Sequence, residues 1–351
     1  MYAPPGGTTP YFPGIVFDQH IPNPPTVNPS SSPWVSSLVR GGNLSLNTIN
    51  VASYEPNDKD HNYTIYYNHS GSNTPVTVHC NLEYASGVSC NDEGMTVYID
   101  SREKIQNNDT SVQDDHLILI DPAAGYEYDF WEVQPPWPPT NGKINAQYSG
   151  RCALAGDGFT NPSYSGPAWN AGCTGDEVGM PLTVGIIRAE DIEAALNSST
   201  GSLPQALAFG VTCDGKSNNN QLPPPFLGPG SGTCSSSTYA IEGNRLYLAM
   251  HDSDVNALGL PKITSVILRT LDEDHYGAFL TETGGSQSGL QMYAISDNSY
   301  LSWGATDPWT SWFLPEAQTE GLPGASSADP NGMYQIQLPI PASLTAKARF
   351  L

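Results

Sequence analysis

The sequence predicts an all-β fold, a β-sandwich of jelly-roll type with long disulfide-stapled loops and one short helix. Three observations predict it. The chain of 351 residues contains 34 glycines and 31 prolines, which break helices and supply turns. Short runs rich in β-branched and aromatic residues recur between these turns. Six cysteines fall in spaced pairs that bracket loop-like sequence.

The chain is expected to form one domain with an appended arm. Residues 1–33 are rich in Pro, Gly, Ser and Asn and are expected to lie on the domain as an extended arm. Residues 34–351 are expected to form a single β-sandwich domain. The one helix is expected at 189–196, where acids in the first turn suit the helix dipole. Strands are expected at 63–67, 76–80, 95–99, 206–211, 246–250, 263–268, 278–281 and 334–338.

The most regular stretch is residues 114–133, DDHLILIDPAAGYEYDFWEV, which predicts a β-hairpin. If residues 122–125 form the loop, Ile118 lies opposite Asp129, and His116 lies opposite Trp131. Alternation then gives the hairpin one mixed polar face and one face that is apolar in its middle. The mixed face holds Asp114, His116, Ile118, Ile120, Glu127, Asp129 and Trp131, and the apolar face holds Leu117, Leu119, Tyr128 and Phe130.

The cysteines indicate an exported protein. Sequential pairing is favoured among several possible connectivities, each bond closing a loop and contributing about 2–4 kcal/mol. No C-x-x-C spacing supports a zinc site. We expect a secreted glycoprotein whose leader has been removed, without a bilayer-spanning run. The expected pairs are Cys80 with Cys90, Cys152 with Cys173, and Cys213 with Cys234, and the glycosylation sequons lie at Asn43, Asn62, Asn68, Asn108 and Asn197.

Charge excludes several partners. The chain has 13 basic and 35 acidic residues, a formal net charge of −22. Such a surface cannot neutralise phosphates, so neither nucleic acid nor an anionic membrane is an expected partner. It suits an extracellular protein that works in acid. No P-loop, dinucleotide fingerprint or G-x-S-x-G occurs, so no nucleotide cofactor and no serine nucleophile are expected.

The histidines and acids leave a metal site open. His116 between carboxylates could shuttle protons, or could be a hydrogen-bonded structural residue. A catalytic metal there would need a second histidine, and His251, in LAMHDSD, is the obvious partner. Asp252 and Asp254 could equally be turn residues. No cofactor is expected, although structural calcium could bind among these acids.

Within the hairpin, Glu127-x-Asp129-x-x-Glu132 resembles the active-site strand of the laminarinase and lichenase type of glycoside hydrolases. The resemblance implies a jelly roll in which Glu127 is the nucleophile, Asp129 the modulator and Glu132 the acid/base. Glycosidic cleavage needs two carboxylates with separated pKa values. A bulge between Asp129 and Glu132 would place all three on one face. The alternative is a solvated strand face that carries acids.

A broader pattern is similar to a group of exported microbial proteins that lack an assigned activity. It comprises D-x-H-L-x-x-x-x-P at 114–122, D-F-W at 129–131, M-P-L-x-x-G at 180–185, L-Y-L-A-M-H at 246–251, Y-G-A-F-L at 276–280 and D-P-W at 307–309. This resemblance implies Asp114, His116, Asp129 and Trp131 as the motif positions. It leaves open which acidic set is active.

We expect a secreted enzyme that acts on polysaccharides, a glycoside hydrolase with paired carboxylates on the hairpin face. Tryptophan rings stack on sugars, so Trp131, Trp169 and Trp309, with His251, are the expected substrate-binding residues. One alternative is a non-catalytic carbohydrate-binding or adhesin protein. Another is a cell-surface or filament subunit that self-assembles when the proline-rich arm adds a strand to a neighbour.

Overall fold

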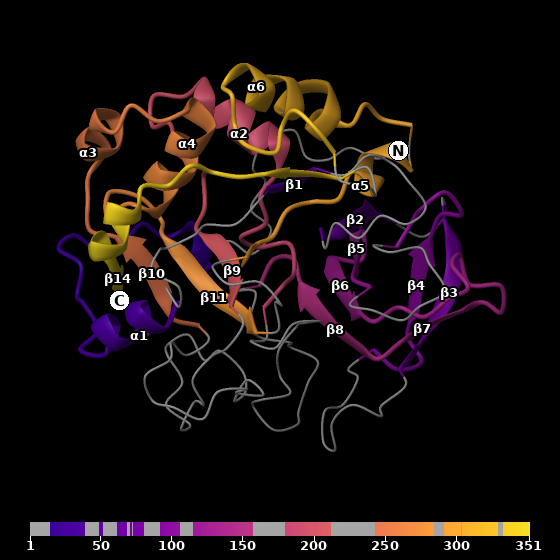
Figure 1. Cartoon of the computed structure of the whole chain (residues 1–351). Coiled ribbons are helices and arrows are strands. Elements are labelled where there is room, and N and C mark those ends of the chain that lie inside the picture. The colour runs from indigo at the N-terminus through magenta and orange to yellow at the C-terminus, as the bar shows by residue number, and fades with distance from the viewer. Residues whose placement is uncertain are drawn as a thin grey trace.

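The structure is a computed structural model that describes residues 15–38, 49–51, 62–68, 71, 73–80, 92–105, 115–156, 180–211, 243–283, 291–302, 304–328 and 333–351. These residues form three mixed sheets and a two-stranded ribbon, with helices packed beside them (Figure 1). The expected all-β jelly roll is wrong, because each of the three larger sheets contains a parallel strand pair and helices cover one of them.

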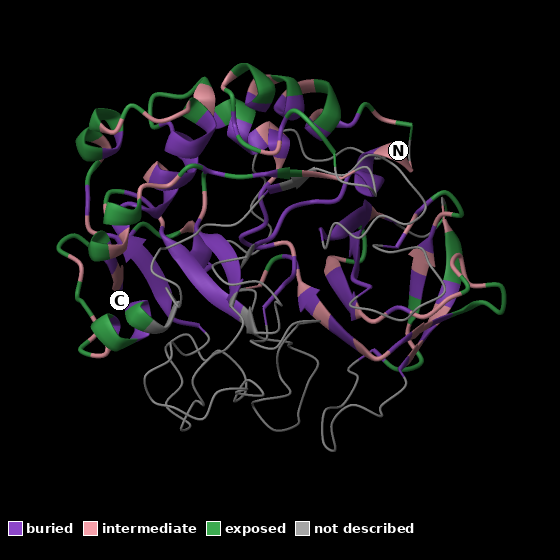
Figure 2. Ribbon diagram, viewed as in Figure 1, coloured by how far each residue is buried: buried purple, intermediate pink, exposed green. Residues whose placement is uncertain are grey.

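The five-stranded sheet lies beneath a helical layer (Figure 1). Ile263, Val266 and Ile267 of the layer are wholly buried, and Figure 2 shows buried inner and exposed outer helix surfaces. The strand order is β12 (Gln291–Met292), β9 (Leu207–Val211), β11 (Ala278–Thr283), β10 (Arg245–Leu248) and β14 (Ala348–Phe350). The helical layer contains α2 (Ala189–Leu196), α3 (Asp252–Ala257), α4 (Lys262–Leu271), the π-helix η3 (Trp309–Phe313) and α6 (Leu314–Thr319).

Two smaller sheets form the other side of the molecule (Figure 1). One has the order β2 (Thr64–Tyr67), β5 (Leu117–Asp121), β6 (Tyr126–Trp131) and β8 (Tyr148–Ala153), and the other has the order β4 (Thr96–Ile99), β3 (Thr74–Cys80) and β7 (Lys143–Ala146). Their facing side chains form a core of their own, which includes Val78, Leu117 and Phe130. The opposite face of the four-stranded sheet joins the main core through Ile118 and Ile120. Strand β1 (Ile49–Val51) pairs with β13 (Tyr334–Ile336) as the ribbon.

The predicted hairpin is confirmed in register. Ile118 pairs with Asp129 and Asp121 pairs with Tyr126. The Asp121 side chain accepts hydrogen bonds from the amides of Ala123 and Ala124, which closes the turn. Gly125 completes it at φ +81°, a conformation that favours glycine. The two predicted faces are also found, since Leu117 and Phe130 lie in the small core and Ile118 in the main one.

The strand expected at 263–268 is wrong, because these residues lie in helix α4. Its β-branched residues suggested a strand, but Ile263, Val266 and Ile267 recur at helical spacing and are wholly buried. The Glu320 carboxylate accepts hydrogen bonds from the amides of Lys262 and Ile263 and so caps the helix from 57 residues away. Local sequence could not reveal that cap.

The expectation of a single helix also fails, although the expected helix α2 has the predicted bounds. The structure contains further helices at η1 (Val16–Asp18), α1 (Ser31–Leu38), α5 (Asn298–Leu301) and η4 (Ala342–Lys347). Helix α1 begins inside the region expected as an extended arm. Ile15, Phe17 and Ile21 are buried there, so the described part of this arm is built into the core.

Two cysteines lie in the described residues, and both Cys80 and Cys152 are disulfide-bonded. The expected partners Cys90 and Cys173, and the third pair, fall outside the described residues, so the pairing stays a prediction. Among the described helices, none combines the length and the apolar character needed to cross a bilayer.

Candidate functional site

Glu127 and Asp129 form a buried carboxyl pair on strand β6. They are two residues apart and therefore on one face of the strand, and neither side chain is exposed to solvent. Both carboxyl groups lie in a part of the strand that excludes solvent. Two like charges side by side in a buried site repel each other, which favours a proton on one of the two carboxyls. The pair thus carries an acid and a carboxylate side by side.

The segment just after Met180 covers this pair. The Leu182 amide donates to Asp129 Oδ2 at 3.0 Å. The Thr183 amide donates to Glu127 Oε1 at 3.1 Å, and the Thr183 hydroxyl donates to Oε2 at 2.6 Å. Both carboxyls therefore receive donors from one short segment, which holds them in fixed orientations.

Burial sets the proton affinity of the pair. It raises the pKa of Glu127 to about 7, against the opposing effect of the two hydrogen bonds that Thr183 donates. A carboxyl with this pKa keeps its proton in acid and exchanges it near neutrality. General acid catalysis uses carboxyls tuned in this way.

The covering segment also joins the two halves of the molecule. Gly185 accepts a hydrogen bond from the Ala208 amide of β9 at 3.0 Å, and Ile187 donates to Tyr293 at 2.8 Å. Gly185 has φ +73°, and a Cβ atom there would lie 2.4 Å from the Ala208 nitrogen. Glycine is therefore required where the segment turns from the carboxyl pair toward the five-stranded sheet.

The expected bulge is not found within β6. Pairing is regular with β5 through Phe130 and with β8 through Trp131, which lies opposite Tyr148. Glu132 follows the end of the strand at φ +50°, in the left-handed region, and is half-buried. Trp131 is also half-buried and lies on the face of Glu127 and Asp129 by alternation. On this face of β6, the buried pair is therefore followed by the partly accessible indole of Trp131.

His116 lies in an aromatic stack. Its ring is 4.6 Å from that of Tyr63, which in turn stacks on Tyr293 at 5.2 Å and 8°. The His116 side chain is almost fully buried. Its carbonyl accepts a hydrogen bond from Thr64. These contacts are those of a packed residue at the junction of β2 and β5.

His251 and Trp309 are not part of the hairpin site. Trp309 is 1% exposed, and its indole donates to the Ile295 carbonyl, so it is a core residue that cannot stack on a sugar. His251 precedes helix α3, which lies on the opposite side of Figure 1 from β5 and β6. It lies at the surface between Glu273 and Asp274, each 3.1 Å away. His116 and His251 are therefore not partners at one metal. Two expected site residues, Asp114 and Trp169, fall outside the described residues.

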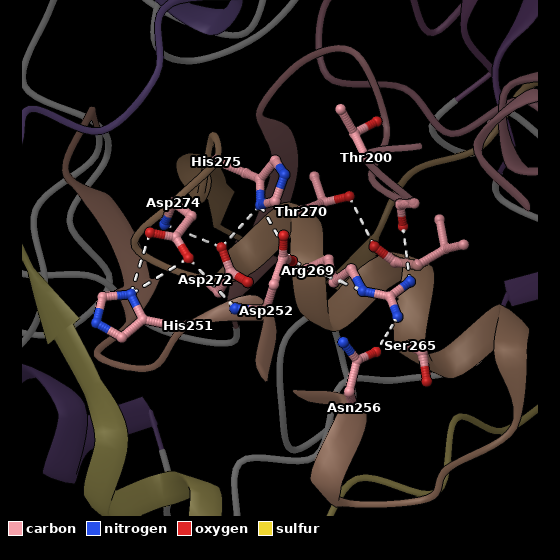
Figure 3. Close-up of polar contacts among 12 residues, drawn as sticks. Thr200, His251, Asp252, Asn256, Ser265, Arg269, Thr270, Asp272, Asp274 and His275 are labelled. Carbon is pink, nitrogen blue, oxygen red and sulfur yellow. Dashed lines mark hydrogen bonds and ion pairs between the residues drawn. The ribbon is translucent and has the colours of Figure 1, made fainter. Parts of the chain in front are cut away.

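Sequence reasoning missed two features. Thr183 and the amide of Leu182 complete the carboxyl site, and the only signal was the M-P-L-x-x-G run. The acids and histidine of LDEDH, residues 271–275, fold next to Asp252 (Figure 3). A histidine within three residues of three acids was the signal there.

No family model matches the chain, and neither a curated protein nor a solved structure matches it.

Proposed function

We propose that this chain is a secreted hydrolase that acts on polysaccharides, with Glu127 and Asp129 as its acid and base. The observation that carries the proposal is the buried carboxyl pair itself, in which the pKa of Glu127 is raised. Glycoside hydrolysis needs one carboxyl that holds a proton and one that is ionised. The raised pKa of Glu127, about 7, makes it the proton donor. Asp129, which accepts the Leu182 amide, is then the carboxylate.

Trp131 supports the choice of a sugar substrate. It follows Asp129 by two residues on the same face and is partly accessible, whereas the pair is sealed. An indole face stacks on the apolar face of a sugar ring. A polysaccharide bound at Trp131 would extend along β6 toward the two carboxyls. The acidic composition, with a net charge of −22, suits a neutral rather than a polyanionic glycan.

The proposal requires the covering segment to move. Both carboxyls are wholly buried, and the amides of Leu182 and Thr183 occupy oxygens that substrate must reach. Turnover therefore requires residues 180–184 to move away from the pair. This movement also breaks the hydrogen bonds from Thr183 to the Glu127 carboxyl. Such conformational steps commonly limit enzyme turnover.

The complete burial of the pair favours a second candidate function, a non-catalytic carbohydrate-binding protein. In that case the carboxyls fasten residues 180–184 to the sheet, and Trp131 binds glycan without turnover. The two functions differ in one respect that can be measured. Only the hydrolase requires a proton on Glu127 for the protein to act on a bound chain.

The test is reducing-end release from a panel of neutral polysaccharides between acidic and neutral pH. Wild type is compared with Glu127→Gln, Asp129→Asn and Trp131→Ala, and with Glu193→Gln as a matched control on the exposed face of α2. Circular dichroism establishes that each variant is folded. Glycan binding is measured in parallel by calorimetry.

The hydrolase predicts that Glu127→Gln and Asp129→Asn lose turnover by at least about a hundredfold while Glu193→Gln keeps it. Binding without turnover in wild type, lost in Trp131→Ala and kept in the carboxyl variants, would establish the second function instead. Turnover that survives in both folded carboxyl variants would contradict the assignment of the pair.

A further inference from the structure

A second polar cluster lies between helices α3 and α4 and the loop that follows α4 (Figure 3). Asp252 is the first residue of α3, Asp272 directly follows the last residue of α4, and His275 lies three residues further on. One ligand atom from each of these residues lies within 4.8 Å of the others. Within the described part of the chain, they form the one group of three such residues. They lie apart from the carboxyl pair, on the other side of the molecule.

The distances within the cluster match a shared ion. His275 Nδ1 is 2.8 Å from Asp272 Oδ1 and 3.8 Å from Asp252 Oδ1. Ligand atoms about 2.0–2.2 Å from one Zn²⁺ at tetrahedral angles are about 3.4 Å apart. The observed separations lie on either side of that value. Small side-chain rotations would therefore place all three atoms around one ion.

Two buried oxygens in the cluster have no hydrogen-bond donor among the described residues. They are Asp252 Oδ1 and Asp272 Oδ2, and the Asp272 side chain is completely buried. His275 Nδ1 and the Asp274 amide both serve the other Asp272 oxygen, Oδ1. Neither of these donors reaches Oδ2. Buried carboxylate oxygens normally have partners or bind metals, and a cation would serve both of these atoms.

The surrounding charge also favours a cation. Arg269 approaches Asp252 Oδ1 at 3.6 Å and supplies one positive charge. Its guanidinium is directed toward the Asn256 side chain and the Gly201 carbonyl, away from Asp272 (Figure 3). Glu273 and Asp274 add two acids beside the cluster. The acidic side chains around the site therefore outnumber the single positive charge of Arg269.

We propose that Asp252, Asp272 and His275 bind a divalent transition-metal ion of the Zn²⁺ class, with water completing the coordination. The donor set selects the class, because imidazole suits Zn²⁺ and its neighbours, whereas Ca²⁺ takes oxygen ligands alone. Three protein ligands and a half-exposed Asp252 leave a coordination position open to solvent. The site is independent of the carboxyl pair on β6.

The test is titration of the full chain with ZnCl₂ by calorimetry at neutral pH, and with Co²⁺ by visible absorption. Wild type is compared with Asp252→Asn and His275→Gln. His251→Gln is the matched control, because His251 lies beside the cluster at the surface and contacts Glu273 and Asp274 instead. Asp252 is half-exposed, so Asp252→Asn keeps the test usable if His275→Gln does not fold.

The expected result is one Zn²⁺ per wild-type chain, with affinity reduced at least about tenfold in Asp252→Asn and His275→Gln and unchanged in His251→Gln. Co²⁺ should give the visible bands of a four- or five-coordinate ion, and excess Ca²⁺ should not displace Zn²⁺. Absence of Zn²⁺ binding, or binding lost in His251→Gln and kept in Asp252→Asn, would overturn the proposal. Displacement by Ca²⁺ would overturn the assignment to a transition metal.

Discussion

Glu127 and Thr183 lie 56 residues apart in the chain, yet Thr183 donates two hydrogen bonds to the Glu127 carboxyl, at 2.6 Å from the hydroxyl and 3.1 Å from the amide. This contact joins the four-stranded sheet to the segment that continues to the five-stranded sheet through Gly185 and Ile187. The carboxyl pair therefore has a structural role whatever chemistry it performs. Its hydrogen bonds hold two halves of the molecule together.

Replacement of Thr183 by valine should destabilise the protein. Valine preserves the shape and the amide but removes the hydroxyl that serves Glu127 Oε2. A buried acceptor left without its donor costs about 1–3 kcal/mol. Denaturant unfolding at pH 5 measures the change. Thr319→Val, at an exposed hydroxyl on α6, is the control and should change stability by less than about 0.5 kcal/mol.

Stability should fall as the pH rises from about 4 to about 8. Burial raises the pKa of Glu103 to about 8 and the pKa of Asp92 to about 6, from ordinary values of 4.5 and 3.8. The folded chain thus holds these protons after the unfolded chain has lost them. The free energy of unfolding is highest in acid and decreases until the folded-state pKa is passed.

Glu103→Gln isolates one part of this dependence. Glutamine stays neutral, so the variant should lose less stability than wild type between pH 4.5 and 8, by a few kcal/mol at about 1.4 kcal/mol per pKa unit. Denaturant unfolding across that pH range measures both slopes. Glu193→Gln should keep the wild-type slope. Parallel curves for wild type and Glu103→Gln would show that Glu103 ionises normally in the folded chain.

Gly185→Ala should be among the costly glycine substitutions. Its left-handed φ alone costs about 1–2 kcal/mol, and the new Cβ would meet the Ala208 nitrogen at 2.4 Å. Gly259 has φ +60°, and no atom of the described residues lies within 4 Å of a Cβ there, so Gly259→Ala reports the backbone cost alone. Gly185→Ala should exceed it by about 1–3 kcal/mol in denaturant unfolding. Equal costs for the two substitutions would mean that the chain around Gly185 shifts to accommodate the Cβ atom without a loss of stability.

Glu320 should stabilise helix α4 from outside it. Glu320→Ala leaves the amides of Lys262 and Ile263 without their carboxylate acceptor. Loss of a helix cap typically costs about 1 kcal/mol. Thermal unfolding should show a lower midpoint than wild type, whereas Glu193→Ala should leave the midpoint unchanged. An unchanged midpoint for Glu320→Ala would show that helix α4 is stabilised by the packing of its apolar face alone.

Some of the fold follows from local sequence. The hairpin register is an example, because the DPAAG turn and the alternation around it are encoded within twenty residues. Helix α2 is another, with acids in its first turn and Ile192 on its buried face. The architecture was predicted incorrectly because its determinants are distant in sequence. Helix α4 depends on Glu320, and the parallel pairing of β9 with β11 joins segments 71 residues apart.

The candidate site was predictable only in part. Glu127, Asp129 and their shared face could be read from alternation along one strand. Their burial could not, because it comes from residues 180–184, which carry no charge or aromatic pattern. Trp309 looked like a sugar platform from its D-P-W context, but Asp307 instead caps its helical turn and the indole enters the core.

The proposed chemistry requires Glu127 to keep a proton beside Asp129 at nearly neutral pH. Infrared difference spectroscopy of wild type against Glu127→Gln tests it most directly, because only the protonated carboxyl gives the high-frequency C=O stretch. We expect a wild-type band at pH 6 that is absent in Glu127→Gln and that titrates near pH 7. Absence of that band from the wild-type spectrum at pH 6 would show that Glu127 is already ionised and that the proposed proton donor is wrong.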